Sequence, residues 1–148
     1  MENKIYAVID TNVLVSALLT SEKQSNPLLV FKAITDEKIV PLFCDEILDE
    51  YREVLSRDKF PFNRVFIDKV LDAFVNNGLN VSRVQSDVFE FPDPKDIVFF
   101  EVSMAVSDSY LVTGNIKHFP KIRKVVTPTE MVAILDKIES MSLKRQKE

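Results

Sequence analysis

Short apolar, β-branched runs alternate along this chain with longer stretches of helical periodicity. The runs are IYAVI, IVPLF, YLVT and VVT, with a weaker one at LNVSRV. Strands separated by helix-length crossovers form parallel sheets whose two faces are covered by helices. We therefore expect an α/β fold with a central parallel sheet. In such folds ligands bind at the carboxyl ends of the strands, where the strand order reverses.

Helices are expected in the stretches between these strands. The candidates lie near residues 13–19, 27–36, 46–57, 63–76 and 95–106. A last helix follows Thr127, because Pro128 suits the first helical position and Thr127 forms a capping box with Glu130. A chain of 148 residues is long enough for one well-packed core, so a single domain is expected.

Cysteine, glycine and apolar content exclude several classes of protein. A single cysteine, Cys44, excludes an internal disulfide framework and a cysteine-rich zinc site. Two glycines are too few for a glycine-rich phosphate loop. No apolar run approaches the length of a membrane span, and the N-terminus does not read as a signal peptide. We therefore expect a cytoplasmic protein without membrane association.

The charge pattern bears on nucleic-acid binding in two ways. A net charge of -4 argues against a surface that is basic all over. However, a cluster of acids that binds cations also makes the net charge negative. The segment IKHFPKIRK, with Lys117, Lys121 and Lys124, is locally basic, and it fits either an RNA contact or a solvated loop.

Two acidic residues stand out by their position in the expected elements. Asp10 directly follows IYAVI and precedes a helix, so it lies at a strand end, where an N-cap role would also explain it. Glu50 lies at the edge of the apolar face of the helix DEILDEYREVLSR, whereas Asp49 and Glu53 point away from that face. A carboxylate at such an edge needs a cation or hydrogen-bond donors. Glu50 is therefore a candidate ligand, or the partner of an Arg or Lys.

Two further candidates lie in FPDPKDIVFFEVSMAVSDSYLVTGN. Asp96 falls in the first turn of a helix that is apolar nearly all round and therefore buried. Asp93, before Pro94, is typical of a turn and a helix cap. Asp108 precedes the strand YLVT and reaches the same end of the sheet only if the chain turns tightly there.

Bringing Asp10, Glu50 and Asp96 together would force like charges into close range, so a cation is expected among them. Ligation by oxygen alone suits Mg²⁺ or Mn²⁺, whereas zinc would favour histidine or cysteine. Such an ion activates water and stabilises charge on a phosphodiester. These residues therefore predict phosphodiester hydrolysis.

At this point the chain resembles the PIN-domain nucleases, and among them the toxin components of toxin–antitoxin systems. The resemblance rests on VIDTNVLVSALL, EILDEYREVL, DPKDIVFFEVSMA and DSYLVTGN with the phenylalanine of KHFP, in this order. It runs from about Lys4 to Lys137. It implies a PIN-like three-layer α/β/α sandwich over residues 1–138, followed by a flexible tail at 139–148, and ribonuclease activity with Mg²⁺ or Mn²⁺.

Residue by residue, the resemblance implies that Asp10, Glu50 and Asp96 are catalytic and bind the metal. The fourth acid of the family commonly stands two residues after the threonine that matches Thr113, where this chain has Asn115. An asparagine ligates through its carbonyl oxygen but brings no charge, so Asp108 is the candidate for a fourth catalytic acid. The residues expected to contact the substrate are Thr11, Asn12, Thr113, Asn115, Lys117, Lys121 and Lys124.

The function expected from these residues is a metal-dependent endoribonuclease, the toxin of a toxin–antitoxin pair. Its expected partners are RNA, a small antitoxin protein and a second copy of the chain. A degenerate PIN module that binds RNA or protein without cleavage also fits Asn115 and the acidic charge. A phosphatase with Asp10 as nucleophile would usually have a second acid where Asn12 stands. The single histidine, His118, is expected to contact phosphate or to be an exposed bystander.

Overall fold

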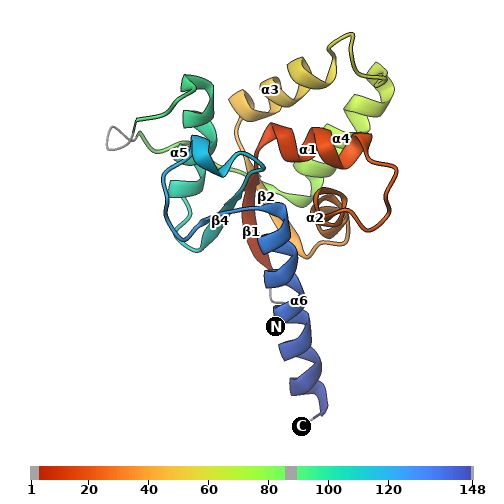
Figure 1. The fold of residues 1–148 in the computed structure, drawn as a ribbon, viewed down its shortest axis with the longest axis vertical. Helices are drawn as coiled ribbons and strands as arrows, with labels where there is room; N and C mark the ends of the chain where they lie inside the picture. Colours follow the sequence, from red (N-terminus) through yellow and green to blue (C-terminus); the bar gives the residue numbers. More distant parts are fainter. Residues whose placement is uncertain (1–3, 86–89, 148) are drawn as a thin grey trace.

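A computed structural model describes residues 4–85 and 90–147 of the chain (Figure 1). In this part of the chain, five strands form one parallel sheet in the order β3-β2-β1-β4-β5. The strands are β1 (Ile5–Ile9), β2 (Ile39–Phe43), β3 (Leu79–Asn80), β4 (Ser109–Val112) and β5 (Val125–Val126). The predicted α/β class and parallel sheet are confirmed, although the weak strand expected at 79–84 is only two residues long.

The predicted helices are present, each within a few residues of its expected bounds. They are α1 (Thr11–Leu19), α2 (Asn26–Thr35), α3 (Asp45–Leu55), α4 (Arg64–Asn77), α5 (Ile97–Met104) and α6 (Pro128–Lys147). Short 3₁₀ turns lie at η1 (Pro94–Asp96) and η2 (Ile116–His118). The capping box is confirmed, since Thr127 N donates to Glu130 Oε1 at 3.0 Å and Glu130 N donates to Thr127 Oγ1 at 3.1 Å. No helix in the described ranges combines the length and apolar character needed to span a membrane.

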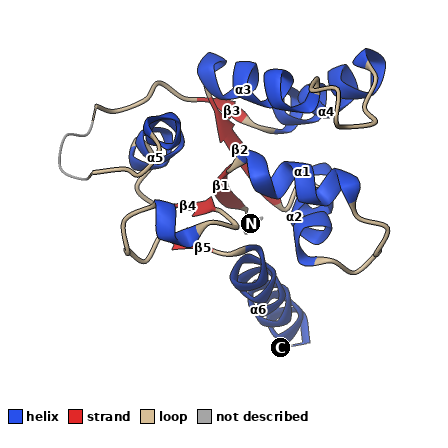
Figure 2. Cartoon of the chain, turned by 45° about the horizontal axis from the view of Figure 1, so that its top comes forward, coloured by secondary structure: helices blue, strands red, loops and turns tan. Residues whose placement is uncertain are grey.

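The strand order reverses beside β1. From β1 the chain moves outward through β2 to β3, and then crosses to the other side of β1 for β4 and β5. The returning helix, α5, packs against β1 and β4, while α2 packs with α1, α4 and α6 on the other face of the sheet (Figure 2). The carboxyl ends of β1 and β4 therefore form the place where open α/β sheets bind ligands.

Tyr51 anchors α3 to the end of β1. Its buried ring packs against Phe74 and Phe99, with centroid separations of 5.0 and 6.3 Å. Its hydroxyl donates a hydrogen bond to the carbonyl oxygen of Ile9. Burial raises the pKa of Tyr51 well above its ordinary value, so the phenol stays a neutral donor. Because Glu50 precedes Tyr51, this anchor also sets where Glu50 lies.

The last turns of α6 project away from the sheet (Figure 1). They include residues 139–147, most of the segment for which we predicted a flexible tail, and this stretch is helical in the structure. Met141 and Leu143 on these turns are exposed. The helix therefore continues past residue 138, where we predicted the domain to end.

Candidate metal centre

Asp10 lies at the carboxyl end of β1, where the strand order reverses. Its side chain is buried, and Oδ2 accepts hydrogen bonds from Thr113 Oγ1 at 2.7 Å and from Asn12 Nδ2 at 3.0 Å. Burial raises the pKa of Asp10 to about 6; the charge of Asp96 adds to this rise, and the Thr113 hydrogen bond opposes it. The side chain does not cap α1, so the alternative of a simple N-cap loses its support.

Glu50 lies on α3 beside Asp10. It is half-buried and accepts a hydrogen bond from the Thr11 hydroxyl. Burial raises the pKa of Glu50, the charge of Asp10 raises it further, and Lys95 opposes the shift. In the described part of the chain no Arg or Lys lies within ion-pair distance of Glu50. Asp49 is exposed, as predicted from the helical face.

Asp96 ends the η1 turn and directly precedes α5, rather than lying in the first turn of that helix as expected. Among the described residues, its buried Oδ2 accepts no hydrogen bond. His118 Nδ1 lies 3.4 Å from this oxygen. Burial raises the pKa of Asp96, and the charges of Asp93 and Glu50 add to the rise, whereas His118 opposes it. Asp93 itself accepts a hydrogen bond from Lys95 N at 3.0 Å, which confirms its predicted capping role.

The three carboxylates interact electrostatically with one another. Asp10 raises the pKa of Glu50, Glu50 raises that of Asp96, and Asp96 raises that of Asp10. As placed, no three His, Cys, Asp or Glu side chains in the described ranges are close enough to enclose an ion. A divalent cation still fits the donor set, because it would relieve the mutual repulsion and satisfy the buried Asp96 oxygen.

Polar neighbours tie these acids to the strand ends. Asn12 Oδ1 accepts a hydrogen bond from Gly114 N at 3.0 Å, and a Cβ on Gly114 would lie 3.2 Å from that oxygen. Asn115 N donates to Thr113 Oγ1 at 3.0 Å, and its own side chain is exposed at the same strand end. The side chain of Thr11 thus binds Glu50, that of Thr113 binds Asp10, and that of Asn12 binds both Asp10 and Gly114. That these three residues also contact the substrate stays a prediction.

The placement of Asp108 corrects its predicted role. Tyr6 pairs with Ser109 in the parallel register of β1 and β4, so Asp108 stands at the amino end of β4. Asp10 stands at the carboxyl end of β1, about five residues or roughly 16 Å further along the strand direction. Asp108 therefore cannot complete the group formed by Asp10, Glu50 and Asp96, which we call the acid cluster.

Lys124 also lies outside this site. Its ammonium donates to the carbonyl oxygens of Ser103 at 2.6 Å and Val106 at 3.3 Å, at the C-terminal end of α5. Burial lowers the pKa of Lys124. Because the charge is used inside the fold, the predicted RNA contact of Lys124 is not supported. Lys117 and Lys121 are exposed and keep that role as a prediction.

Sequence reasoning did not assign Lys95 or the contact of His118 with Asp96. Lys95 lies close enough to Glu50 to lower its pKa. The only signal for Lys95 was its position beside Asp96 in DPKD. His118 follows the strand that ends at Thr113, but the sequence does not indicate which acid it meets.

Arg83 joins α3 to α5, the helices next to the acid cluster. Its Nε donates to Glu101 Oε1 at 2.6 Å, and its Nη1 donates to Glu46 Oε2 at 2.6 Å. The side chain of Glu101 is only 4% exposed. Since Glu46 lies one turn before Glu50 on α3, this ion-pair network helps to fix the distance between Glu50 and Asp96.

The comparisons with known proteins agree with this fold. Residues 6–117 match a family model described as PIN domain, and this range contains Asp10, Glu50 and Asp96. No curated protein and no solved structure matches the chain. The family match covers most of the chain, and the sheet with its flanking helices is that of a PIN-like α/β/α sandwich. The chain belongs to the PIN domain family.

Proposed function

We propose that this protein is a divalent-metal-dependent endoribonuclease. Membership of the PIN domain family supports nuclease chemistry. The observation that carries the proposal is the cluster of Asp10, Glu50 and Asp96 where the strand order reverses, with all three pKa values raised and one buried oxygen without a hydrogen bond. These are the properties of a site that needs a cation.

Asp10, Glu50 and Asp96 would hold Mg²⁺ or Mn²⁺. When bound, the ion would lower the pKa of a water molecule and neutralise charge on the scissile phosphodiester. Thr11 and Thr113 keep Glu50 and Asp10 oriented through their hydroxyl hydrogen bonds.

Exposed lysines near the carboxyl ends of β1 and β4 would bind the RNA substrate. Lys117 on η2 and Lys121 after it are exposed, and we expect them to contact phosphates of the RNA backbone. Lys95 carries a third positive charge beside Glu50. Together they would offset the repulsion between an acidic site and a polyanion.

The test is cleavage of single-stranded RNA with Mn²⁺ by the wild type and by Asp10→Asn. We expect Asp10→Asn to lose at least about 100-fold in rate and EDTA to abolish cleavage by the wild type. Asp49→Asn, an exposed acid on α3, is the matched control and should cleave normally. Equal rates for the wild type and Asp10→Asn would contradict the proposal.

The proposal extends to a toxin that is neutralised by a small antitoxin, and to a dimer of the chain. The support is the family membership and the resemblance in the four segments quoted above. Expression of the chain alone should arrest growth, and co-expression of a small neighbouring reading frame should relieve the arrest. Normal growth without that partner would remove this extension, and sedimentation of the pure protein tests the dimer.

A degenerate PIN module that binds RNA or protein without cleavage is the second candidate. It is favoured by the neutral Asn115 and by the separation of the three acids as placed. A manganese titration separates the two functions. A wild-type protein that binds no Mn²⁺ at millimolar concentration and does not cleave RNA would establish the second candidate over the first.

A further inference from the structure

Three phenylalanines stack on one another at the junction of α3 and α4. The rings of Phe60 and Phe62 have centroids 5.8 Å apart at 27°, and those of Phe62 and Phe66 have centroids 5.4 Å apart at 22°. Phe66 is 38% exposed, and its neighbour Val65 is 65% exposed. We call Phe60, Phe62 and Phe66 the phenylalanine ladder. Phe60 and Phe62 are half-buried, so Phe66 with Val65 forms the exposed apolar end of this stack, outside the acid cluster. Exposed apolar side chains that adjoin one another are candidates for a binding surface.

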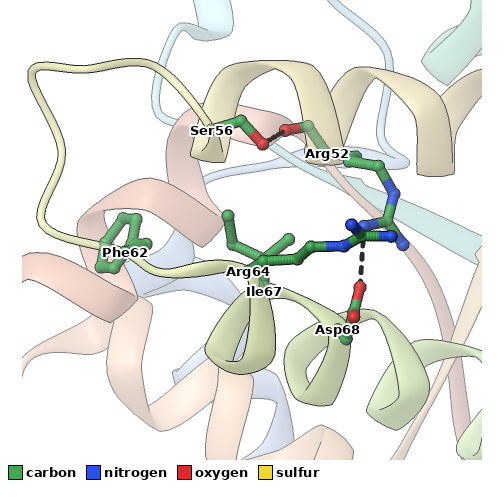
Figure 3. Close-up of a pocket in the computed structure, with 6 residues that line it drawn as sticks. All are labelled: Arg52, Ser56, Phe62, Arg64, Ile67 and Asp68. Carbon is green, nitrogen blue, oxygen red and sulfur yellow. Dashed lines mark hydrogen bonds and ion pairs between the residues drawn. The ribbon is translucent and has the colours of Figure 1, made fainter.

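Phe62, the middle ring of the ladder, lines a cleft of about 460 Å³ between α3 and α4 (Figure 3). The cleft is lined by Arg52, Ser56, Phe62, Arg64, Ile67 and Asp68. Figure 3 shows the side chains of Arg52 and Arg64 extending to the same end of the cleft. Arg52 Nη1 donates to Asp68 Oδ1 at 2.7 Å, whereas Arg64 is exposed and forms no ion pair with the described residues.

The surroundings of the ladder are basic, although the chain is acidic. Residues 52–69 carry five basic and three acidic side chains, against a net charge of -4 for the whole chain. Two of these acids, Glu53 and Asp68, already pair with arginines. The ammonium of Lys59 lies 5.1 Å from the centroid of the Phe60 ring. With Arg52 and Arg57 paired, Lys59, Arg64 and Lys69 are the cations of this segment that remain available to an anionic ligand.

Aromatic faces interleaved with cations match the chemistry of single-stranded nucleic acid. Unpaired bases stack on aromatic rings, and guanidinium groups bind the phosphates. A duplex offers no free base faces, so it fits this surface less well. A peptide would use the apolar rings but would give Arg64 and Lys59 a partner only if it were acidic.

The cleft lies on the helix that also carries Glu50. Arg52 follows Glu50 by two residues and Ser56 follows it by six, about 9 Å along the helix axis, so both point to another side of α3 than Glu50. We propose that the ladder and its cleft bind a single-stranded RNA segment outside the metal centre, with a base on Phe66 and a phosphate on Arg64. The proposal rests on the proposed function in one respect: the bound strand is then the substrate of the nuclease.

The experiment measures RNA binding without cleavage. A labelled single-stranded RNA of about 12 nucleotides, a length within the range of known single-strand sites, is titrated in EDTA and followed by fluorescence anisotropy. We expect Phe66→Ala and Arg64→Ala each to weaken binding about 10-fold or more. Arg64→Ala should also reduce the slope of log affinity against log salt by about one. Both positions are exposed, so the variants should fold, and circular dichroism checks this.

Matched controls are Leu143→Ala and Arg145→Ala, an exposed apolar residue and an exposed arginine on α6. Both should bind RNA like the wild type. Unchanged affinity in Phe66→Ala and Arg64→Ala would overturn the proposal, as would equal affinity of the wild type for a duplex. A wild-type dimer that Phe66→Ala converts to a monomer, without change in RNA affinity, would make the ladder an interface between copies and would also overturn it.

These outcomes are independent of the proposed nuclease activity. If the wild type cleaves RNA with Mn²⁺ and the ladder variants bind RNA normally, the nuclease proposal stands and the ladder proposal falls. If the ladder variants lose RNA binding in EDTA but the wild type never cleaves, the ladder proposal stands and the nuclease proposal falls.

Discussion

The buried carboxylates of Glu101 and of the acid cluster have different charge partners. Glu101 is almost fully buried, and the guanidinium of Arg83 lies against it. Asp10 is similarly buried, but its carboxylate meets only neutral donors, from Thr113 and Asn12. A buried charge costs several kcal/mol unless it is paired. The fold thus supplies a guanidinium to Glu101, whereas among the described residues no Arg or Lys forms an ion pair with Asp10 or Glu50, and only His118 approaches Asp96, at 3.4 Å.

This difference distinguishes a carboxylate that only holds the fold together from a carboxylate that belongs to a binding site. Where a carboxylate only joins helices, as Glu101 joins α5 to Arg83 and α3, the chain provides the partner itself. At the carboxyl ends of β1 and β4 it provides donors that orient the acids but do not neutralise them. We infer that the missing charge comes from a bound divalent ion.

The largest effect is expected in the pH dependence of the acid cluster. The pKa of Asp10 rises from 3.8 to about 6 on folding, so its stabilising contribution is full below pH 3.8 and is lost as the pH rises through about 6. At 1.36 kcal/mol per pKa unit this amounts to about 3 kcal/mol. In EDTA, Asp10→Asn should therefore gain most of this, about 2.4 kcal/mol of unfolding free energy over the wild type between pH 4 and pH 7, measured by urea unfolding. A constant difference over this range would contradict the prediction.

Removing the cation from Glu101 is expected to be the next largest effect. Arg83→Met takes away the guanidinium beside a carboxylate that is 4% exposed. Because Arg83 is itself 35% exposed and water screens it, we expect a loss of about 2 kcal/mol rather than the 3–5 kcal/mol of a fully buried pair.

Urea unfolding measures this loss, and Mn²⁺ should not reverse it. Glu46→Gln, at the exposed end of the network, should cost less than about 1 kcal/mol. The double variant Arg83→Met/Glu101→Met should recover most of the loss, because neither charge remains. A double variant less stable than Arg83→Met would show that Glu101 is held by something other than this pair.

Thr113→Val tests the neutral donors of the acid cluster. The change keeps the shape of a fully buried side chain but removes the hydroxyl that donates to Asp10 at 2.7 Å. We expect a loss of about 1.5 kcal/mol at pH 7, measured by urea unfolding, since the acceptor is charged. Thr35→Val removes an exposed hydroxyl that donates to Lys32 O and should be nearly neutral. Equal effects at both positions would mean that the hydroxyl of Thr113 does not support Asp10.

Asn115→Asp is expected to have the smallest effect. It adds a carboxylate at an exposed position beside Thr113, so water and salt screen its charge. We expect Mn²⁺ affinity to rise about two- to fivefold, measured by calorimetric titration. Asn76→Asp, exposed on α4, is the control for net charge alone. The same gain in both variants would remove position 115 from the site.

Local patterns predicted most of the fold and the positions of Asp10 and Glu50, and the role of the three acids as metal ligands stays a prediction. Asp10 was found because it follows an apolar strand, and Glu50 because helical periodicity placed it at the edge of a buried face. The capping box at Thr127 was equally local and is confirmed. In each case the information lies within one turn or one strand.

Residues whose roles depend on distant partners were missed or misplaced. Arg83 lies in the weak strand expected at 79–84, which does not indicate its partners, and these partners, Glu46 and Glu101, are 37 and 18 residues away. Lys124 belongs to a basic run, and only its contacts with the end of α5 separate it from Lys121. The parallel-sheet rule that places Asp10 also places Asp108 at the opposite end, and expecting a tight turn there was the error.

Calorimetric titration with Mn²⁺ at pH 7.5 tests the central claim that the acid cluster binds a divalent ion. The wild type should bind Mn²⁺, and Asp10→Asn and Glu50→Gln should each weaken binding by about 10-fold or more, because each removes a charged ligand. Glu53→Gln, an exposed glutamate one turn further along α3, should bind like the wild type. No binding by the wild type at millimolar Mn²⁺, or equal affinities for Glu50→Gln and Glu53→Gln, would contradict the claim.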